Sequence, residues 1–354
     1  MIPRFGDANP YLRLLASALE QRGISVSLAK RHGRASLFRA IREHGRPHIV
    51  HLHWQHRFLV PRSGSVWQAT TSTALFFQQW LALRAIGVRF VWTVHNIVNH
   101  ERVLERWELQ ACRLLAKVAD AIIVHCPSAV PLVADAYRIS PRRISVVPHG
   151  HYMDCYPPAV GRSQARRDLG LPADSRIFLF FGQIREYKGL DRLFSAFSKV
   201  MDGSSLLIVL GKPKTRALEQ SVAGMAATNS NVIARLGHVE DQLLVSYLSA
   251  CDAVVLPYIG SLTSGSAILA ASYGRGLIVP AIGCMKDWPD SAAIRYEPAQ
   301  PEGLEAALRD ALSCDLDTMG EAAKQHAASF EWSEIGEKLD LLYHSTAGGK
   351  TSKG

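Results

Sequence analysis

Short runs of β-branched and aromatic residues alternate with helix-length amphipathic segments along the whole 354-residue chain. This alternation is typical of stacked βαβ units, in which the strands lie parallel and helices cover the sheet. The first half predicts strands at 24–28, 48–53, 88–95, 121–126 and 144–148. The second half predicts strands at 177–181, 206–210, 232–236, 253–258, 277–280 and 294–297. The sequence therefore predicts an α/β protein with parallel sheets.

The length of the chain indicates two domains, because it exceeds one typical α/β unit. The segment 156–175 is rich in proline, glycine and charge, which is typical of an interdomain linker. We therefore predict one doubly wound, Rossmann-like domain over 1–157 and a second over 158–330. A last helix over 331–346 is expected to pack back toward the first domain, with a flexible tail over 347–354. Little chain precedes the first predicted helix at 9–23, so a strand there would be very short.

The two halves differ in charge. Residues 1–150 hold 20 Lys+Arg against 8 Asp+Glu, a net charge of 20 − 8 = +12; the rest holds 20 against 23, or −3. A basic first domain indicates an anionic partner such as a phospholipid surface, a diphosphate-linked lipid, an acidic sugar or nucleic acid. A merely solvated surface is the alternative. No signature of an RNP, KH or helix-turn-helix module accompanies the charge, so we expect no nucleic-acid partner.

A basic loop follows the first predicted strand of the second half. In FFGQIREYKGL (180–190) the strand gives way to Gly182, Arg185 and Lys188 before a helix opens at Gly189. Amide N–H groups at a helix start, with two cations beside them, suit a diphosphate. Ordinary surface cations are the alternative interpretation.

A second strand-to-helix junction carries small polar residues. Tyr258 ends a predicted strand, and Thr263, Ser264 and Gly265 open the next helix, where phosphate could approach the amides. A simple Ser/Thr cap on a core helix is the alternative. The position after a strand's carboxyl end favours a ligand. Two weaker sets of donor-site candidates lie between these loops: Gly211, Lys212, His238 and Val239.

Histidines and other polar residues follow several strands of the first half. Since the carboxyl ends of parallel strands meet at one sheet edge, we expect them to line one site. Structural histidines are the alternative, and metal binding is disfavoured because no H-x-x-x-H helix or nearby carboxylate pair accompanies them. The candidates are His53, Trp54, His95, Asn96, His100, Glu101, His149, His151 and Tyr152.

Six phrases in order carry a family resemblance: NPYL, HLHW, HNIVNHE, HGHY followed by Asp154, FGQIREYKG and LPYIGSLTSG. With them the chain resembles the GT-B glycosyltransferases, in particular the xanthan-type, GDP-mannose-dependent β-mannosyltransferases of bacterial exopolysaccharide synthesis. The resemblance implies two Rossmann-like domains facing across a cleft, with acceptor bound by the first and nucleotide-sugar by the second. It also implies transfer of a sugar, mannose favoured, to a polyprenyl-diphosphate-linked or other saccharide acceptor.

One departure from the retaining GT-B pattern matters for the mechanism. The Glu-x7-Glu pair typical of retaining members is missing, with Ser261 and Leu269 at its positions. The resemblance to the xanthan-type enzymes instead implies an inverting, single displacement, which needs a base for the acceptor hydroxyl. Glu101 is the first candidate, as an acidic group beside His95 where burial would raise its pKa, and His95 is the second. A solvated helix-start carboxylate is the alternative for Glu101.

No metal or other cofactor is expected, because GT-B enzymes use Arg, Lys and helix ends for the diphosphate. We expect a cytoplasmic enzyme, either free or peripheral on the anionic inner face of the membrane. Two other functions stay open at this stage: a GT-B-fold sugar-nucleotide epimerase, and a non-catalytic donor-binding partner of another transferase.

Overall fold

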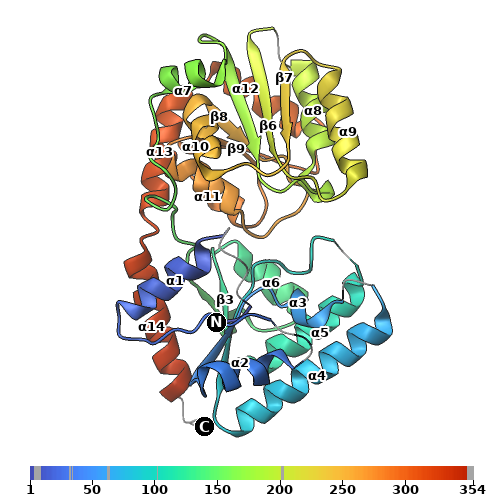
Figure 1. The fold of residues 1–354 in the computed structure, drawn as a ribbon, viewed down its shortest axis with the longest axis vertical. Helices are drawn as coiled ribbons and strands as arrows, with labels where there is room; N and C mark the ends of the chain where they lie inside the picture. Colours follow the sequence, from blue (N-terminus) through green and yellow to red (C-terminus); the bar gives the residue numbers. More distant parts are fainter. Residues whose placement is uncertain are drawn as a thin grey trace. The chain divides into compact units, whose positions relative to one another are not determined.

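The computed structural model describes residues 1–3, 9–31, 33, 35–61, 64–101, 103–200 and 203–348 (Figure 1). The chain forms two compact units, Met1–Gly150 with Glu331–Gly354, and His151–Phe330. The division falls after Gly150 rather than after the predicted residue 157. His151 N–H donates to the Phe330 carbonyl at 3.3 Å, and Tyr152 N–H donates to Ser272 Oγ at 3.0 Å, so both residues are bonded into the second unit.

The first unit contains a four-stranded parallel sheet in the order β1-β2-β3-β4. Its strands are β1 (Ile49–Leu52), β2 (Arg89–Thr93), β3 (Ala121–Val124) and β4 (Ile144–Val146). Its helices are α1 (Tyr11–Glu20), α2 (Ser36–His44), α3 (His56–Leu59), α4 (Val66–Ala85), α5 (Glu105–Val118), α6 (Ala129–Tyr137) and α14 (Trp332–Gly348).

Helix α14 joins the first unit through α1. Leu15 and Leu19 of α1 pack in one core with Ile335 and Leu339 of α14. The backbones approach so closely that a Cβ at Gly336 would lie 2.7 Å from the Ala18 carbonyl oxygen. Helix α14 runs to Gly348, beyond the predicted start of the tail at 347, and the remaining residues 349–354 lie outside the described part of the chain.

The predicted strand at 24–28 is wrong. The segment makes two polar contacts with the start of the chain: the Met1 amino group donates to the Ser27 carbonyl at 2.7 Å, and Ala29 N–H donates to the Met1 carbonyl at 2.9 Å. Ile2 forms a single bridge to Leu52 of β1. Apart from these contacts with Met1, the run 24–28 forms no strand among the described residues, because a strand needs a continuous partner.

The second unit contains a six-stranded parallel sheet in the order β10-β9-β8-β5-β6-β7, flanked by helices (Figure 1). Its strands are β5 (Arg176–Phe181), β6 (Ser205–Gly211), β7 (Val232–Leu236), β8 (Ala253–Val255), β9 (Gly276–Pro280) and β10 (Ala293–Tyr296). Its helices are α7 (Arg162–Leu169), α8 (Leu190–Val200), α9 (Arg216–Ala227), α10 (Asp241–Ala250), α11 (Gly265–Ser272), α12 (Gly303–Ser313) and α13 (Leu316–Ala328).

The strand order creates a switch point between β5 and β8. From β5 the chain proceeds to β6 and β7 on one side and then returns to β8 on the other. Ligands of open α/β sheets bind at the carboxyl ends of strands beside such a point. In β5, Phe178 and Phe180 on one face and Ile177 and Leu179 on the other are all fully buried, as a parallel sheet covered on both sides requires. The predicted α/β class with two parallel-sheet domains is confirmed.

Within the described residues, none of the helices is both long enough and apolar enough to cross a membrane.

Candidate active site

The loop after β5 is shaped by two glycines in left-handed or related backbone regions. Gly182 has φ +116° and Gly189 has φ +62°. A Cβ at Gly189 would lie 2.2 Å from the carbonyl oxygen of Pro257, so the turn presses directly against the segment that follows β8. Ile259 N–H donates to the Tyr187 carbonyl at 2.9 Å across the same junction. The two predicted phosphate loops therefore meet beside the switch point.

Lys188 is a buried ammonium group, 7% exposed. Its Nζ donates to Tyr258 Oη at 2.9 Å and lies 4.6 Å from the centre of the Tyr258 ring. Among the described residues no carboxylate pairs with it. A buried cation with only a phenol and aromatic faces around it is costly, so an anionic ligand would complete its coordination.

The charge of Lys188 also affects the pKa of the Tyr258 hydroxyl. Burial alone would raise the pKa of its hydroxyl, but the Lys188 charge and hydrogen bonds with Lys188, Ser266 and Ser264 outweigh burial and lower it. Ser264 also caps α11, accepting from Ala267 N–H at 3.2 Å. A Cβ at Gly182 would lie 3.4 Å from both Lys188 Nζ and Ser266 Oγ. Cation, hydroxyls and the start of α11 thus surround one place, a suitable arrangement for phosphate oxygens.

The other predicted donor residues lie on neighbouring loops of the same sheet edge. Gly211, at the end of β6, has φ +149°, and a Cβ there would lie 1.8 Å from the Gly182 carbonyl oxygen. Ile184 N–H donates to the Lys212 carbonyl at 3.0 Å, which joins this loop to the one after β5. Lys212 itself is exposed. Arg185 is half-buried, and its guanidinium donates to the Gln183 side chain at 2.7 Å.

The remaining donor candidates are more open to solvent. His238 follows β7, is exposed and lies 3.3 Å from the Glu240 carboxylate. Val239 beside it and Thr263 before α11 are half-buried. Their side chains are therefore accessible on the loops after β7 and β8.

Two residues predicted for the acceptor side belong to the second unit instead. His151 and Tyr152 are both buried there. The Tyr152 hydroxyl lies 3.5 Å from the position of a Cβ on Gly265, at the first turn of α11. The prediction grouped them with the first domain because they follow its last strand in sequence; the hydrogen bonds to Phe330 and Ser272 decide otherwise.

In the first unit, three buried histidines form a hydrogen-bonded chain. His53 Nδ1 lies 3.1 Å from His95 Nε2, His95 Nδ1 lies 3.4 Å from His125 Nε2, and His125 Nδ1 lies 3.0 Å from the Val147 carbonyl oxygen. A carbonyl can only accept, so His125 donates through Nδ1, His95 donates to His125, and His53 donates to His95. Both ring nitrogens of His95 are therefore engaged.

Burial keeps this cluster uncharged. It lowers the pKa of His53 and His95 well below 6.5, and neighbouring histidines lower both further. Burial also lowers the pKa of His125 to about 4 and that of His149 to about 3. His53 is the first residue of this hydrogen-bonded series, and its Nε2 has no hydrogen-bond partner among the described residues. These four histidines are therefore uncharged at neutral pH.

Aromatic rings enclose the histidines. Trp54, which has φ +37°, stacks on His95 with centroids 4.6 Å apart and planes 11° apart. The Tyr11 ring of α1 meets the His95 ring edge-on, with centroids 5.3 Å apart, and lies tilted against the His149 ring at 4.6 Å. Sequence reasoning missed His125 and Tyr11. His125 could have been found, because it follows β3 as His53 follows β1 and His95 follows β2.

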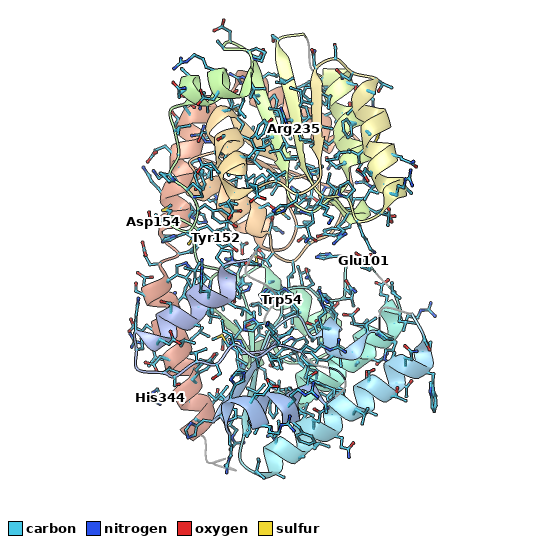
Figure 2. All side chains as sticks on the ribbon, viewed as in Figure 1. Trp54, Glu101, Tyr152, Asp154, Arg235 and His344 are labelled. Atoms are coloured by element: carbon cyan, nitrogen blue, oxygen red, sulfur yellow. The ribbon has the colours of Figure 1, made fainter. Side chains whose placement is uncertain are left out.

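Asn96, His100 and Glu101 lie on the loop that follows β2, and all three are half-buried. The Glu101 backbone N–H donates to Asn99 Oδ1 at 3.3 Å. Figure 2 labels Trp54 and Glu101 in this unit, and Tyr152 and Asp154 in the second. In the described part of the chain, no three His, Cys, Asp or Glu side chains are arranged to hold a metal ion.

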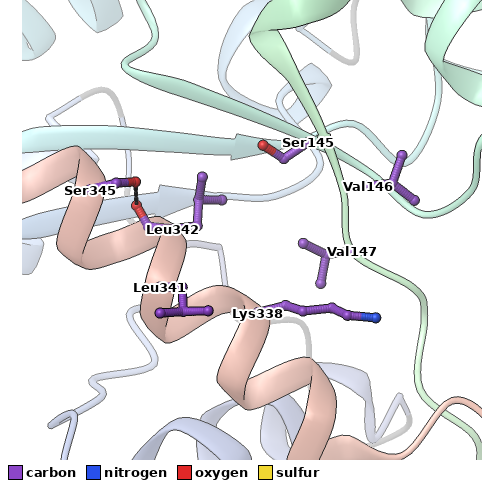
Figure 3. Close-up of a pocket in the computed structure, with 7 residues that line it drawn as sticks. All are labelled: Ser145, Val146, Val147, Lys338, Leu341, Leu342 and Ser345. Atoms are coloured by element: carbon purple, nitrogen blue, oxygen red, sulfur yellow. Dashed lines mark hydrogen bonds between the residues drawn. The ribbon is translucent and has the colours of Figure 1, made fainter.

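A hollow of about 340 Å³ lies between the end of β4 and α14 (Figure 3). Its lining is largely apolar and includes one cation; the residues are Ser145, Val146, Val147, Lys338, Leu341, Leu342 and Ser345. None of the predicted site residues lines it.

Two family models match the chain, one per domain. Residues 8–153 match the model described as "Glycosyltransferase Family 4", and residues 175–314 match the model described as "Glycosyl transferases group 1". The two parallel sheets, with the switch point between β5 and β8 in the second, fit the same class. The chain belongs to the GT-B glycosyltransferases, and it is an enzyme that transfers a sugar from a nucleotide-sugar donor.

The chain is also similar to individual proteins of this class. The chain is 28% identical over 349 residues to the GDP-mannose:glycolipid 4-beta-D-mannosyltransferase of Xanthomonas campestris pv. campestris, covering 94% of this chain and 86% of the relative. It is 26% identical to a D-inositol 3-phosphate glycosyltransferase of Geodermatophilus obscurus, covering 76% and 64%. Among solved structures, the sucrose-phosphate synthase of Thermosynechococcus elongatus shares the fold, with TM-score 0.75, 19% identity and coverage of 96% and 93%.

Proposed function

We propose that the protein transfers mannose from GDP-mannose to a lipid-linked oligosaccharide by an inverting, metal-independent displacement. The donor and acceptor classes are those in the name of the Xanthomonas relative, which aligns with nearly the whole chain. The observation that carries the proposal is the buried ammonium of Lys188, which has no carboxylate partner among the described residues. A pyrophosphate would supply the missing anion.

The leaving group is stabilised by the second unit. Lys188, the Tyr258 hydroxyl and the amide groups at the start of α11 hold the diphosphate and offset the negative charge that grows on it as the sugar departs. Arg185 reaches an outer phosphate oxygen. This set of cations and helix-end amides takes the place of a metal ion.

The acceptor is activated by the first unit. Glu101 removes the proton from the attacking hydroxyl, since His95 uses both ring nitrogens inside the histidine chain. His53, Trp54, Asn96, His100 and His149 contribute to binding the acceptor saccharide. The direct displacement needs no nucleophilic carboxylate, which agrees with Ser261 and Leu269 at the positions of the retaining pair.

Replacing Lys188 by alanine tests the donor site. We expect kcat to fall by about 10²- to 10³-fold, as for loss of one transition-state donor, with little change in thermal stability. Transfer from GDP-, UDP-, dTDP- and ADP-sugars is measured with purified protein. Lys199→Ala is the matched control, because this lysine on α8 has a 60% exposed side chain and pairs with Glu305. Wild-type turnover in the Lys188 variant would contradict the assignment of the donor site. Faster transfer from a sugar nucleotide other than GDP-mannose would contradict mannose as the donor sugar.

The lipid-linked acceptor implies a peripheral position on an anionic membrane. The first half carries the +12 charge (20 − 8), and Trp67 on α4 is 76% exposed. Basic charge with an exposed aromatic side chain favours a headgroup surface. We expect cosedimentation with phosphatidylglycerol vesicles that weakens as salt is raised, and none with phosphatidylcholine vesicles. Equal binding to both, or no binding to either, contradicts the membrane proposal and leaves the transfer reaction standing.

A further inference from the structure

The loop that follows β2 is held by side chains from the helices beneath it. Tyr137 Oη of α6 donates to the Ile97 carbonyl at 2.8 Å. Two residues further on, Glu108 Oε2 of α5 accepts the Asn99 N–H at 2.9 Å. Asn99 Oδ1 in turn accepts the Glu101 N–H at 3.3 Å. The carboxylate of Glu108 thus holds Asn99, and the side chain of Asn99 accepts the hydrogen bond from the Glu101 backbone.

Glu108 is an unusual residue to find at this position, since it is 1% exposed. Within the described residues it has no cationic partner, and its Oε1 has no hydrogen-bond partner at all. Its place in the first turn of α5 gives it only the helix dipole and the Asn99 amide as compensation. A buried carboxylate with so little compensation destabilises the fold, so a role beyond stability is indicated.

We propose that Glu108 is a positioning residue that fixes the Asn99–Glu101 segment and thereby orients Glu101 toward the acceptor hydroxyl. This inference rests on the proposed function, in which Glu101 is the base. Because a charged acceptor holds an amide more strongly than a neutral one, the ionised form of Glu108 is the one that orders the loop.

Titration of Glu108 falls near neutral pH. Burial raises its pKa to about 7, the hydrogen bond from Asn99 opposes this rise, and the negative charge of Glu105 on the same helix adds to it. The adjacent Cys112 on α5 and Tyr137 on α6 are neutral, because burial raises the pKa of both groups. The loop therefore tightens as the pH rises through about 7, which adds an acid limb to the pH profile of transfer.

The test compares Glu108→Ala with Glu108→Gln in the full-length protein. Alanine removes the acceptor for the Asn99 amide, whereas glutamine keeps a neutral one. In the alanine variant we expect faster hydrogen exchange in peptides covering 96–101 and a fall of about 10- to 100-fold in kcat/KM for the acceptor. Donor affinity should stay within about twofold, since the donor binds elsewhere. The glutamine variant, whose neutral side chain resembles protonated Glu108, should regain only part of the protection at pH 8 and should show no acid limb near pH 7.

Glu305→Ala is the matched control, because Glu305 is likewise a buried glutamate but lies on α12 of the second unit. Its exchange over 96–101 should equal that of the wild type. If hydrogen exchange over 96–101 is unchanged in Glu108→Ala, the Glu108–Asn99 hydrogen bond does not order the loop, and the proposal is overturned. Faster exchange with normal acceptor turnover overturns the positioning role while the transfer reaction stands. A wild-type protein that transfers no sugar overturns the proposed function itself, and the exchange data then show separately whether Glu108 orders the loop.

Discussion

At the scale of single residues, the two candidates for the catalytic base differ in their surroundings. His95 is buried, neutral and bonded through both ring nitrogens to His53 and His125. To accept a proton from an acceptor hydroxyl it would have to break one of these bonds. Glu101 is half-buried, and its backbone is held by Asn99. We therefore favour Glu101, because a half-buried carboxylate on a hydrogen-bonded loop suits proton removal better than an imidazole whose two ring nitrogens are both hydrogen-bonded.

Replacing Glu101 by glutamine should therefore lower kcat by about 10²- to 10⁴-fold, the usual contribution of a general base. Affinity for the nucleoside diphosphate should persist, because only the proton acceptor is lost. Single-turnover transfer and calorimetric titration with GDP measure the two effects. Glu43→Gln serves as the control, since Glu43 is an exposed carboxylate on α2 of the same unit. Unchanged turnover in Glu101→Gln would move the base role to His95 or to bound water.

At the scale of elements, periodicity in the sequence predicted the ten strands that form the sheets and the helices between them, because each depends on local pattern and burial. The run 24–28 forms no strand because a strand needs a partner, and over residues 1–3, the described start of the chain, the structure shows a single bridge, from Ile2 to Leu52. The loops around Lys188 and Tyr258 were each predicted to bind phosphate because both follow parallel strands, and the structure brings them into contact. Glu108, Ser266 and Tyr11 could not be found that way, since they come from helix faces whose rotation the strand pattern does not determine.

At the scale of the whole molecule, we expect the two units to differ in how their stability depends on pH. The first unit buries His51, His53, His95, His125 and His149, and their shared property is a pKa well below the ordinary value of 6.5. Below pH 6.5 the unfolded chain binds protons that the folded unit does not, so unfolding takes up protons and becomes more favourable as the pH falls. The second unit buries only His151 among the described residues.

The first unit should therefore lose stability as the pH falls from 6.5 to about 4. A change of one pKa unit corresponds to about 1.4 kcal/mol, so His125 and His149 alone account for a loss of several kcal/mol. Tryptophan fluorescence follows this unit selectively, because all seven tryptophans except Trp288 belong to it. Urea midpoints by fluorescence should fall steeply from pH 7 to 5. His344→Asn, which changes an 81% exposed side chain on α14, should keep the same steep dependence. A urea midpoint that stays level over this range would mean that the histidines accept protons without unfolding of the unit, which contradicts a histidine chain that is neutral in the folded protein.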